Sequence, residues 1–200
     1  MKIGAINFDD ECKLLSYVRD KYGNAIELRV DANGAFSSAD WQEKLQALSV
    51  FKLHSIEQPV PPNEHLLMAE VTRKSPVPVA LDEDIVQYPQ NKPPGQLLDK
   101  LKPLYIVLKP GIIGGFAKTR EWIDEAQKRG IKWWITSALE SNIGLNAIAQ
   151  FTLGHKNNEY HGLGTGQLYS NNVASPLATE KGNFIVNTRQ KWDVSAILNH

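Results

Sequence analysis

Two hydrophobic patterns alternate along most of the chain. Short apolar runs rich in β-branched residues are typical of buried parallel strands, and longer stretches with apolar residues at helical spacing are typical of amphipathic helices. The expected strands are residues 2–6, 26–31, 53–58, 77–82, 105–109, 133–137 and 160–164. The expected helices between them are residues 10–21, 38–48, 63–74, 95–101, 116–129 and 143–153. This alternation predicts β/α units around a parallel sheet, which is an α/β fold.

The polar residues at or next to one end of each run recur at a regular interval of about 27 residues, which is the length of one β/α unit. They are Lys2, Asp31, Glu57, Asp82, Lys109, Ser137 and, in place of a polar residue, Gly164. In a (β/α)8 barrel the functional groups stand at the C-terminal ends of the strands, so the pattern favours a barrel. An open doubly wound sheet more usually has a Gly-x-Gly-x-x-Gly turn after its first strand, and residues 4–7 do not form one.

The seven expected strands are one fewer than a closed (β/α)8 barrel contains. Because Lys2, the first residue of this series, already stands at the start of the chain, we expect the missing strand to precede Met1. The predicted fold is therefore an incomplete TIM barrel, with strands two to eight in residues 1–175. Residues 176–200 contain one short apolar strand at 183–186 and no helix of the barrel type, and we expect them to pack outside the barrel.

The charge balance argues against two classes of partner. The chain has 22 Lys and Arg residues and 22 Asp and Glu residues, so no overall basic field attracts nucleic acid or an anionic membrane. It contains neither a signal-type apolar segment near Met1 nor a run of about 18 apolar residues. Cys12 is the only cysteine, which excludes an internal disulfide and suits a reducing compartment. We expect a cytoplasmic protein that binds neither nucleic acid nor membrane.

Asp31, Glu57 and Asp82 end three consecutive expected strands. One such residue alone would more often cap a helix or pair with a lysine, but agreement in phase across three units brings three carboxylates to one side of the barrel mouth. Converging negative charges need a cation, and a site made only of oxygen atoms is the kind that Mg²⁺ prefers. The five histidines show no metal-binding spacing. The pattern predicts a Mg²⁺ site in which Mn²⁺ can substitute.

Lys2 and Lys109 end the second and sixth expected barrel strands, which face each other across an eight-stranded ring. A lysine in a loop is normally a solvated charge. Opposed lysines beside a carboxylate-bound dication have a more specific use, because the metal can bind a substrate carboxylate and stabilise the enediolate that forms when the adjacent carbon loses its proton. A lysine whose pKa is lowered by the metal and by desolvation can act as the base. The predicted substrate is a small-molecule carboxylate.

The sequence motifs at these strand ends resemble a known family. Arg-Val-Asp-Ala-Asn at 29–33, Ile-Glu-Gln-Pro at 56–59, Leu-Asp-Glu at 81–83 and Val-Leu-Lys-Pro at 107–110 are similar to motifs of the muconate-lactonising-enzyme branch of the enolase superfamily. The resemblance covers nearly the whole chain. Within that branch, residues 2–9, 136–141 and 162–166 resemble the dehydratases of menaquinone biosynthesis. The resemblance implies a TIM barrel that carries a Mg²⁺-dependent lyase.

The resemblance also implies roles for individual residues. Lys2 matches the lysine that removes the proton alpha to the substrate carboxylate, and Lys109 matches the protonated lysine on the opposite face. Asp31, Glu57 and Asp82 match the metal ligands. Other residues match positions around this centre, namely Asn33 and Glu83 beside the ligands and Arg29, Ser137, Gly164 and Thr165 near the substrate.

The reaction stays open among relatives that share both lysines. The alternatives to the lyase are an N-succinylamino acid racemase, a dipeptide epimerase, and a barrel fragment without activity. We expect the first lysine of the family's Lys-x-Lys motif, the first barrel strand and the N-terminal capping domain to be absent from this sequence. Unpaired strand edges would then favour self-association, and an open barrel mouth would leave the isolated chain with little or no activity.

Overall fold

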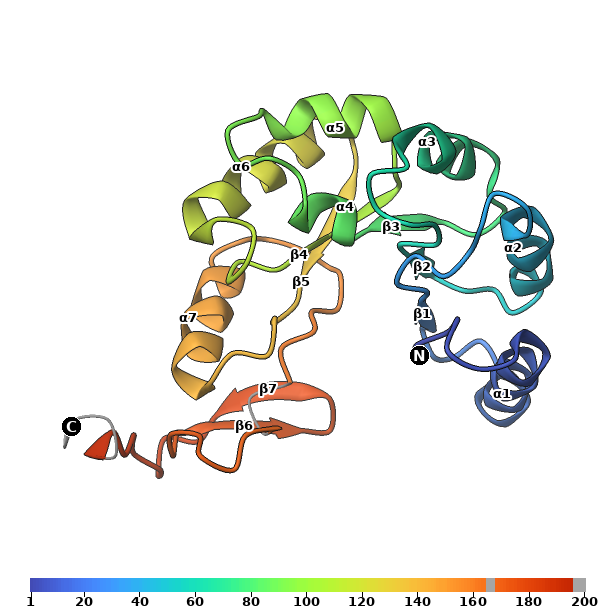
Figure 1. Ribbon diagram of the computed structural model, residues 1–200. Coiled ribbons are helices and arrows are strands. Elements are labelled where there is room, and N and C mark those ends of the chain that lie inside the picture. The colour runs from blue at the N-terminus through green and yellow to red at the C-terminus, as the bar shows by residue number, and fades with distance from the viewer. Residues whose placement is uncertain (165–167, 196–200) are drawn as a thin grey trace. The chain divides into compact units, whose positions relative to one another are not determined.

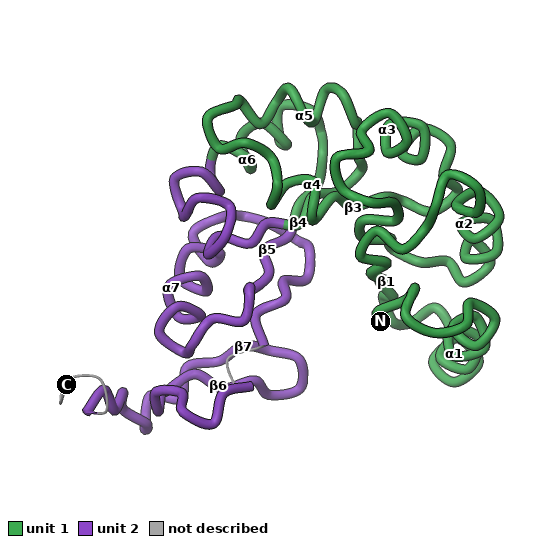
Figure 2. The backbone as a smooth tube through the Cα atoms, viewed as in Figure 1, with its two compact units in different colours: residues 1–107, 121–133 green, residues 108–120, 134–200 purple. Residues whose placement is uncertain are grey.

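The computed structural model describes residues 1–164 and 168–195, which form two compact units (Figure 2). Unit 1 comprises Met1–Val107 and Glu121–Trp133. Unit 2 comprises Leu108–Arg120 and the described residues from Trp134 onward. The boundary runs through two strands, which begin in unit 1 and end in unit 2. A partial barrel at 1–175 with a separate segment at 176–200 stays a prediction.

Unit 1 is built on parallel strands. They are β1 (Arg29–Asp31), β2 (Ser55–Glu57), β3 (Val79–Leu81) and β4 (Tyr105–Leu108), followed in the hydrogen-bonded order by β5 (Lys132–Ile135). In the register of the first three strands, Val30 lies opposite Ile56 and Ile56 lies opposite Val79. Parallel strands in sequential order are what consecutive right-handed β/α crossovers produce. The α/β prediction is confirmed.

The helices of unit 1 pack on one side of these strands, as Figure 1 shows for the first four of the long helices. They are α1 (Phe8–Tyr22), α2 (Trp41–Ser49), α3 (His65–Lys74), α5 (Pro94–Leu101) and most of α6 (Gly115–Lys128). Their apolar faces are buried, with Leu15, Leu45, Met68 and Leu98 fully covered. Each such side chain contributes about 1.5–3 kcal/mol to folding by leaving water. Within the described residues, no helix combines the length and apolar character that a membrane span requires.

Unit 2 contains α7 (Asn142–Leu153) and an antiparallel strand pair, β6 (Leu177–Glu180) with β7 (Asn183–Val186). The strand expected at 183–186 is confirmed. The sequence analysis did not predict β6, because its four residues show little alternation of apolar and polar positions. The two strands are joined by Lys181 and Gly182 with φ values of 49° and 78°, which is the left-handed conformation that a two-residue hairpin turn requires.

Two expected strands are reduced to single bridges. Residues 2–6 are reduced to one parallel bridge between Lys2 and Asp31, because the chain turns at Gly4 with a φ of 85°. Residues 160–164 are reduced to a bridge between Thr136 and Gly162 within unit 2. Glycines weaken a strand because they bring no side chain to pack, so both runs end early.

Candidate metal centre and active site

Three strand ends lie side by side in unit 1. Asp31 and Glu57 are the last residues of β1 and β2 and lie directly opposite each other in the parallel register. On its other side, Glu57 is paired with Ala80 of β3. Asp82 follows two residues after Ala80, directly after the end of β3. Asp82 is also the N-cap residue of α4 (Glu83–Val86), a short helix that the hydrophobic pattern did not predict. The backbone thus has the phase that the sequence predicted.

The three carboxylates differ in their surroundings. Asp82 is buried with 1% of its surface exposed, whereas the side chain of Asp31 is 20% exposed and Glu57 is half-buried. Among the described residues, these three groups do not all lie within 4.8 Å of one another. Like charges repel, and the carboxylate of Asp31 instead contacts the ammonium group of Lys2. Convergence of the three carboxylates on one ion stays a prediction.

Lys2 lies beside the strand end that carries Asp31. Its Nζ donates hydrogen bonds to Oδ2 of Asp31 at 2.7 Å and to Oδ1 of Asn33 at 2.5 Å. Burial alone would lower the pKa of Lys2, but the hydrogen bond and charge of Asp31, together with the charges of Glu57 and Glu83, raise it above its usual value. Lys2 is therefore an ammonium ion at neutral pH in this structure and offsets part of the negative charge of the acids.

Asn33 and Glu83 connect the turns that follow β1 and β3. The backbone N–H of Asn33 donates to Oδ1 of Asp31 at 3.1 Å, and its side-chain Nδ2 donates to Oε1 of Glu83 at 2.7 Å. The second oxygen of Glu83, Oε2, is buried and accepts no hydrogen bond from the described residues. Asn33 thus contacts Asp31, and Glu83 directly follows Asp82 in the chain. Support of a metal site by these two residues stays a prediction.

The turn after Lys2 depends on Glu11, a residue that the sequence analysis did not single out. Glu11 is 2% exposed, and its Oε1 accepts hydrogen bonds from the N–H groups of Gly4, Ala5 and Ile6 at 2.6, 3.2 and 3.4 Å. Successive N–H groups around one anion form a nest. Gly4 is required in this turn, because its φ is positive and a Cβ there would collide with the side chain of Ala35.

The other predicted residues lie elsewhere. Arg29 begins β1, and its Nε donates to Oε1 of Glu27 at 2.6 Å. Lys109, half-buried directly after β4, and the buried Ser137 belong to unit 2, as does the exposed Gly164. The opposition of Lys109 to Lys2 and the substrate contacts of these residues stay predictions. Thr165 lies outside the described residues.

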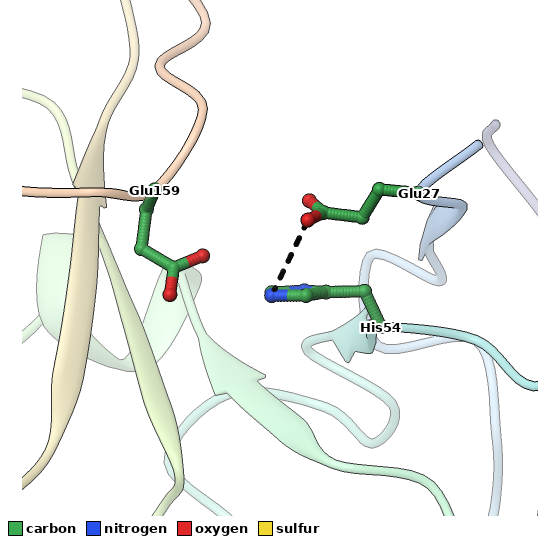
Figure 3. Close-up of side chains that lie close together, drawn as sticks. All are labelled: Glu27, His54 and Glu159. Atoms are coloured by element: carbon green, nitrogen blue, oxygen red, sulfur yellow. Dashed lines mark ion pairs between the residues drawn. The ribbon is translucent and has the colours of Figure 1, made fainter. Parts of the chain in front are cut away.

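A second candidate group of metal ligands lies at the N-terminal ends of β1 and β2, away from Asp31 and Glu57. Glu27 precedes β1 and His54 precedes β2, with Oε2 of Glu27 3.9 Å from Nε2 of His54 (Figure 3). The ring of His54 also packs against Tyr105 at a centroid distance of 4.5 Å. Glu159, the third residue drawn, belongs to unit 2. Within unit 1 this pair offers two ligands, which is fewer than a closed metal site uses.

The strand-end group of unit 1 offers more oxygen donors than the pair of Glu27 and His54 does. Its candidate donors are all carboxylate oxygens, which suit Mg²⁺ or Mn²⁺, and Oε2 of Glu83 is a further buried oxygen beside them without a hydrogen-bond donor among the described residues. Lys2 already supplies one positive charge to the same group. Residues 31, 57 and 82 could therefore hold a cation next to an amine that can exchange a proton.

The chain is similar to known enzymes. Residues 1–190 match the family described as enolase C-terminal domain-like. The o-succinylbenzoate synthase of Desulfotalea psychrophila is 49% identical over 183 residues, which are 91% of this chain and 50% of that protein. An N-succinylamino acid racemase from an Amycolatopsis species is 30% identical over 187 residues, which are 90% of this chain and 48% of that protein.

The fold is similar to a solved structure as well. The crystal structure of MenC from Desulfotalea psychrophila has a TM-score of 0.86 at 47% identity and covers 92% of this chain and 51% of its own. This chain therefore spans about half the length of the relatives that it matches.

Proposed function

The chain belongs to the enolase C-terminal domain-like family, and from that premise we propose that it carries the catalytic residues of an o-succinylbenzoate synthase. The TIM-barrel fold class is confirmed by this family and by the similarity to a solved relative. The observation that carries the proposed function is the position of Lys2, whose Nζ lies 2.7 Å from Asp31 at the end of β1, where Glu57 ends the neighbouring strand.

The proposed reaction is the loss of water from 2-succinyl-6-hydroxy-2,4-cyclohexadiene-1-carboxylate. Lys2 removes the proton alpha to the carboxylate, and the hydroxyl group leaves from the neighbouring carbon. If both groups depart from one face, Lys2 can return its proton to the leaving hydroxyl, so that the products are o-succinylbenzoate and water. Lys109, as an ammonium group on the opposite face, would stabilise the negative charge that develops on the carboxylate.

The proposed metal ligands are Asp31, Glu57 and Asp82, with Asn33 and Glu83 holding them in place. A divalent cation here, Mg²⁺ or in its place Mn²⁺, supplies a Lewis acid for the substrate carboxylate. The same positive charge would offset the carboxylates that raise the pKa of Lys2, and so release its amine as a base. The metal-ligand group and Lys2 therefore depend on each other in this proposal.

The setting that we propose follows from this reaction. The substrate is a small-molecule carboxylate, the reaction belongs to menaquinone biosynthesis, and Arg29, Ser137 and Gly164 contribute contacts to the substrate. A cytoplasmic location and self-association of the chain stay predictions.

An N-succinylamino acid racemase is the second candidate, because a relative of that name is 30% identical over 90% of this chain. In a racemase, Lys2 and Lys109 would act as acid and base on the two faces of one carbon. A dipeptide epimerase would use the same pair.

The two candidates are separated by assaying the complete protein that carries this chain with both substrate types. We expect formation of o-succinylbenzoate that stops when the divalent cation is removed with a chelator, and racemisation of N-succinylamino acids that is at least about 10-fold less efficient in kcat/KM, a difference of 1.4 kcal/mol. Racemisation without dehydration would contradict the proposed synthase.

A further inference from the structure

Gln58 directly follows Glu57 and is fully buried. Its backbone φ is 37°, a left-handed value that a residue other than glycine adopts only at a cost in free energy. Such a conformation persists where the surrounding structure fixes it. The hydrogen bonds of Gln58 provide this constraint.

Gln58 connects the segments that follow three strands. Its carbonyl oxygen accepts a hydrogen bond from the N–H of Gly34, in the turn after β1, at 2.6 Å. Its own N–H donates to the carbonyl oxygen of Ala80 on β3 at 2.9 Å. Its side-chain Oε1 accepts hydrogen bonds from the N–H groups of Asp82 and Asp84, both at 3.2 Å. Gln58, which directly follows β2, is thus hydrogen-bonded both to the turn after β1 and to the end of β3.

The side-chain amide of Gln58 is held in one orientation by Asp84. Nε2 of Gln58 donates to Oδ2 of Asp84 at 2.9 Å and to the carbonyl oxygen of Val60 at 3.1 Å. The side chain of Asp84 has no exposed surface, and its Oδ1 accepts from the N–H of Asn63 at 2.8 Å and lies 3.3 Å from Nε2 of His65. The Gln58 amide cannot rotate without breaking buried hydrogen bonds, which is costly because the freed groups find no water.

We propose that Gln58 is a positioning residue that sets the spacing between the strand ends carrying Asp31, Glu57 and Asp82, with Asp84 as its buried anchor. This role rests on the metal site of the proposed function. The bond to the N–H of Asp82 fixes the backbone from which that carboxylate extends. Groups that orient metal ligands in this way typically change metal affinity by about 10–100-fold when they are mutated.

The test measures Mn²⁺ affinity of the full chain by titration calorimetry, at a temperature where every variant is folded. Gln58→Glu retains an oxygen for the two N–H groups but places a second oxygen against the carboxylate of Asp84 and the carbonyl of Val60. We expect Mn²⁺ affinity to fall by about 10–100-fold. We also expect hydrogen exchange at the N–H groups of Asp82 and Asp84 to accelerate by about 10-fold, measured without metal.

A second variant tests the anchor. In the double variant Gln58→Glu with Asp84→Asn, the amide at position 84 can donate a hydrogen bond to the carboxylate at position 58, which is the reverse of the wild-type direction. The double variant also keeps the net charge of the wild type. We expect most of the lost Mn²⁺ affinity to return. Should Gln58→Glu fail to fold, Gln58→Asn takes its place, because it has the same amide on a side chain one methylene shorter and cannot reach both sets of partners.

Two controls separate positioning from general stability. Gln42→Glu makes the same chemical change at an exposed position of α2 and should leave Mn²⁺ affinity unchanged. Leu97→Val, in the buried face of α5, lowers global stability and should also leave Mn²⁺ affinity unchanged.

Each outcome bears on a separate claim. Mn²⁺ binding by the wild type and equally tight binding by the Gln58 variants would overturn the positioning role while leaving the metal site in place. Loss of affinity in Leu97→Val that matches the loss in Gln58→Glu would also overturn it, as would a double variant that recovers no affinity. A wild-type chain that binds no Mn²⁺ would overturn the metal site itself and the role of Gln58 with it.

Discussion

Replacing Lys2 with alanine is expected to lower the rate of the synthase reaction by about 10³-fold or more in the complete protein that carries this chain. Lys2 is the amine that lies against Asp31 and Asn33 at the proposed centre, so its removal deletes the base. Exchange of the α-proton of the substrate with solvent deuterium should stop as well. Steady-state turnover and deuterium exchange followed by NMR measure the two effects.

Lys13→Ala is the matched control for this substitution. Lys13 lies on the exposed surface of α1, where its Nζ is 2.7 Å from Oδ1 of Asp10, so its loss should leave turnover unchanged. Near-normal turnover in Lys2→Ala would remove Lys2 from the mechanism. Loss of turnover with continued α-proton exchange would assign the base to another residue.

Glu57→Gln is expected to weaken binding of a divalent cation by at least about 100-fold, because it removes a charged ligand rather than a group that only orients one. Glu57 lies in register with Asp31 and is half-buried at the end of β2, so an amide there replaces one negative charge of the proposed site. Titration calorimetry with Mg²⁺ or Mn²⁺ should find one site in the wild type.

Glu27→Gln is the control that separates this site from the group at the other ends of the strands. Glu27 contacts Arg29 and lies 3.9 Å from His54, so its substitution would weaken a metal bound there. We expect unchanged affinity in Glu27→Gln. A strong loss of cation affinity in Glu27→Gln, together with normal affinity in Glu57→Gln, would show that the metal binds near Glu27 and His54. A metal at those strand ends could not serve the proposed reaction.

Hydrophobic periodicity predicted the elements of this fold where burial is regular. The five strands from β1 to β5 and the six long helices occur where apolar runs and helical spacing indicated them, because each buries one continuous apolar surface. The short helix α4 and strand β6 lack that signal. Residues 2–6 are interrupted at Gly4, where the chain turns with a positive φ, so backbone conformation limits this strand more than hydrophobicity does. Residues 160–164 contain two glycines, which bring no side chain to pack.

The candidate site was predictable in one respect and not in another. Residues 31, 57 and 82 share a phase along the chain, and the parallel register of β1 with β2 and of β2 with β3 places the three strand ends side by side. Convergence of their carboxylates stays a prediction. Gln58 and Glu11 could not be found in this way, because their partners lie on other segments and are set by tertiary packing. The only local signal that could have indicated such a role is the amide that directly follows a strand-end acid in Glu57-Gln58.

Anomalous diffraction from crystals of the protein grown with Mn²⁺ tests the central claim most directly, because it locates the ion. The account predicts a single strong peak in unit 1 within about 2.1–2.3 Å of one oxygen from each of Asp31, Glu57 and Asp82, as expected for oxygen ligands of a small divalent cation. A peak at Glu27 and His54 instead, or no peak at the strand ends at a Mn²⁺ concentration that saturates the calorimetric site, would contradict it.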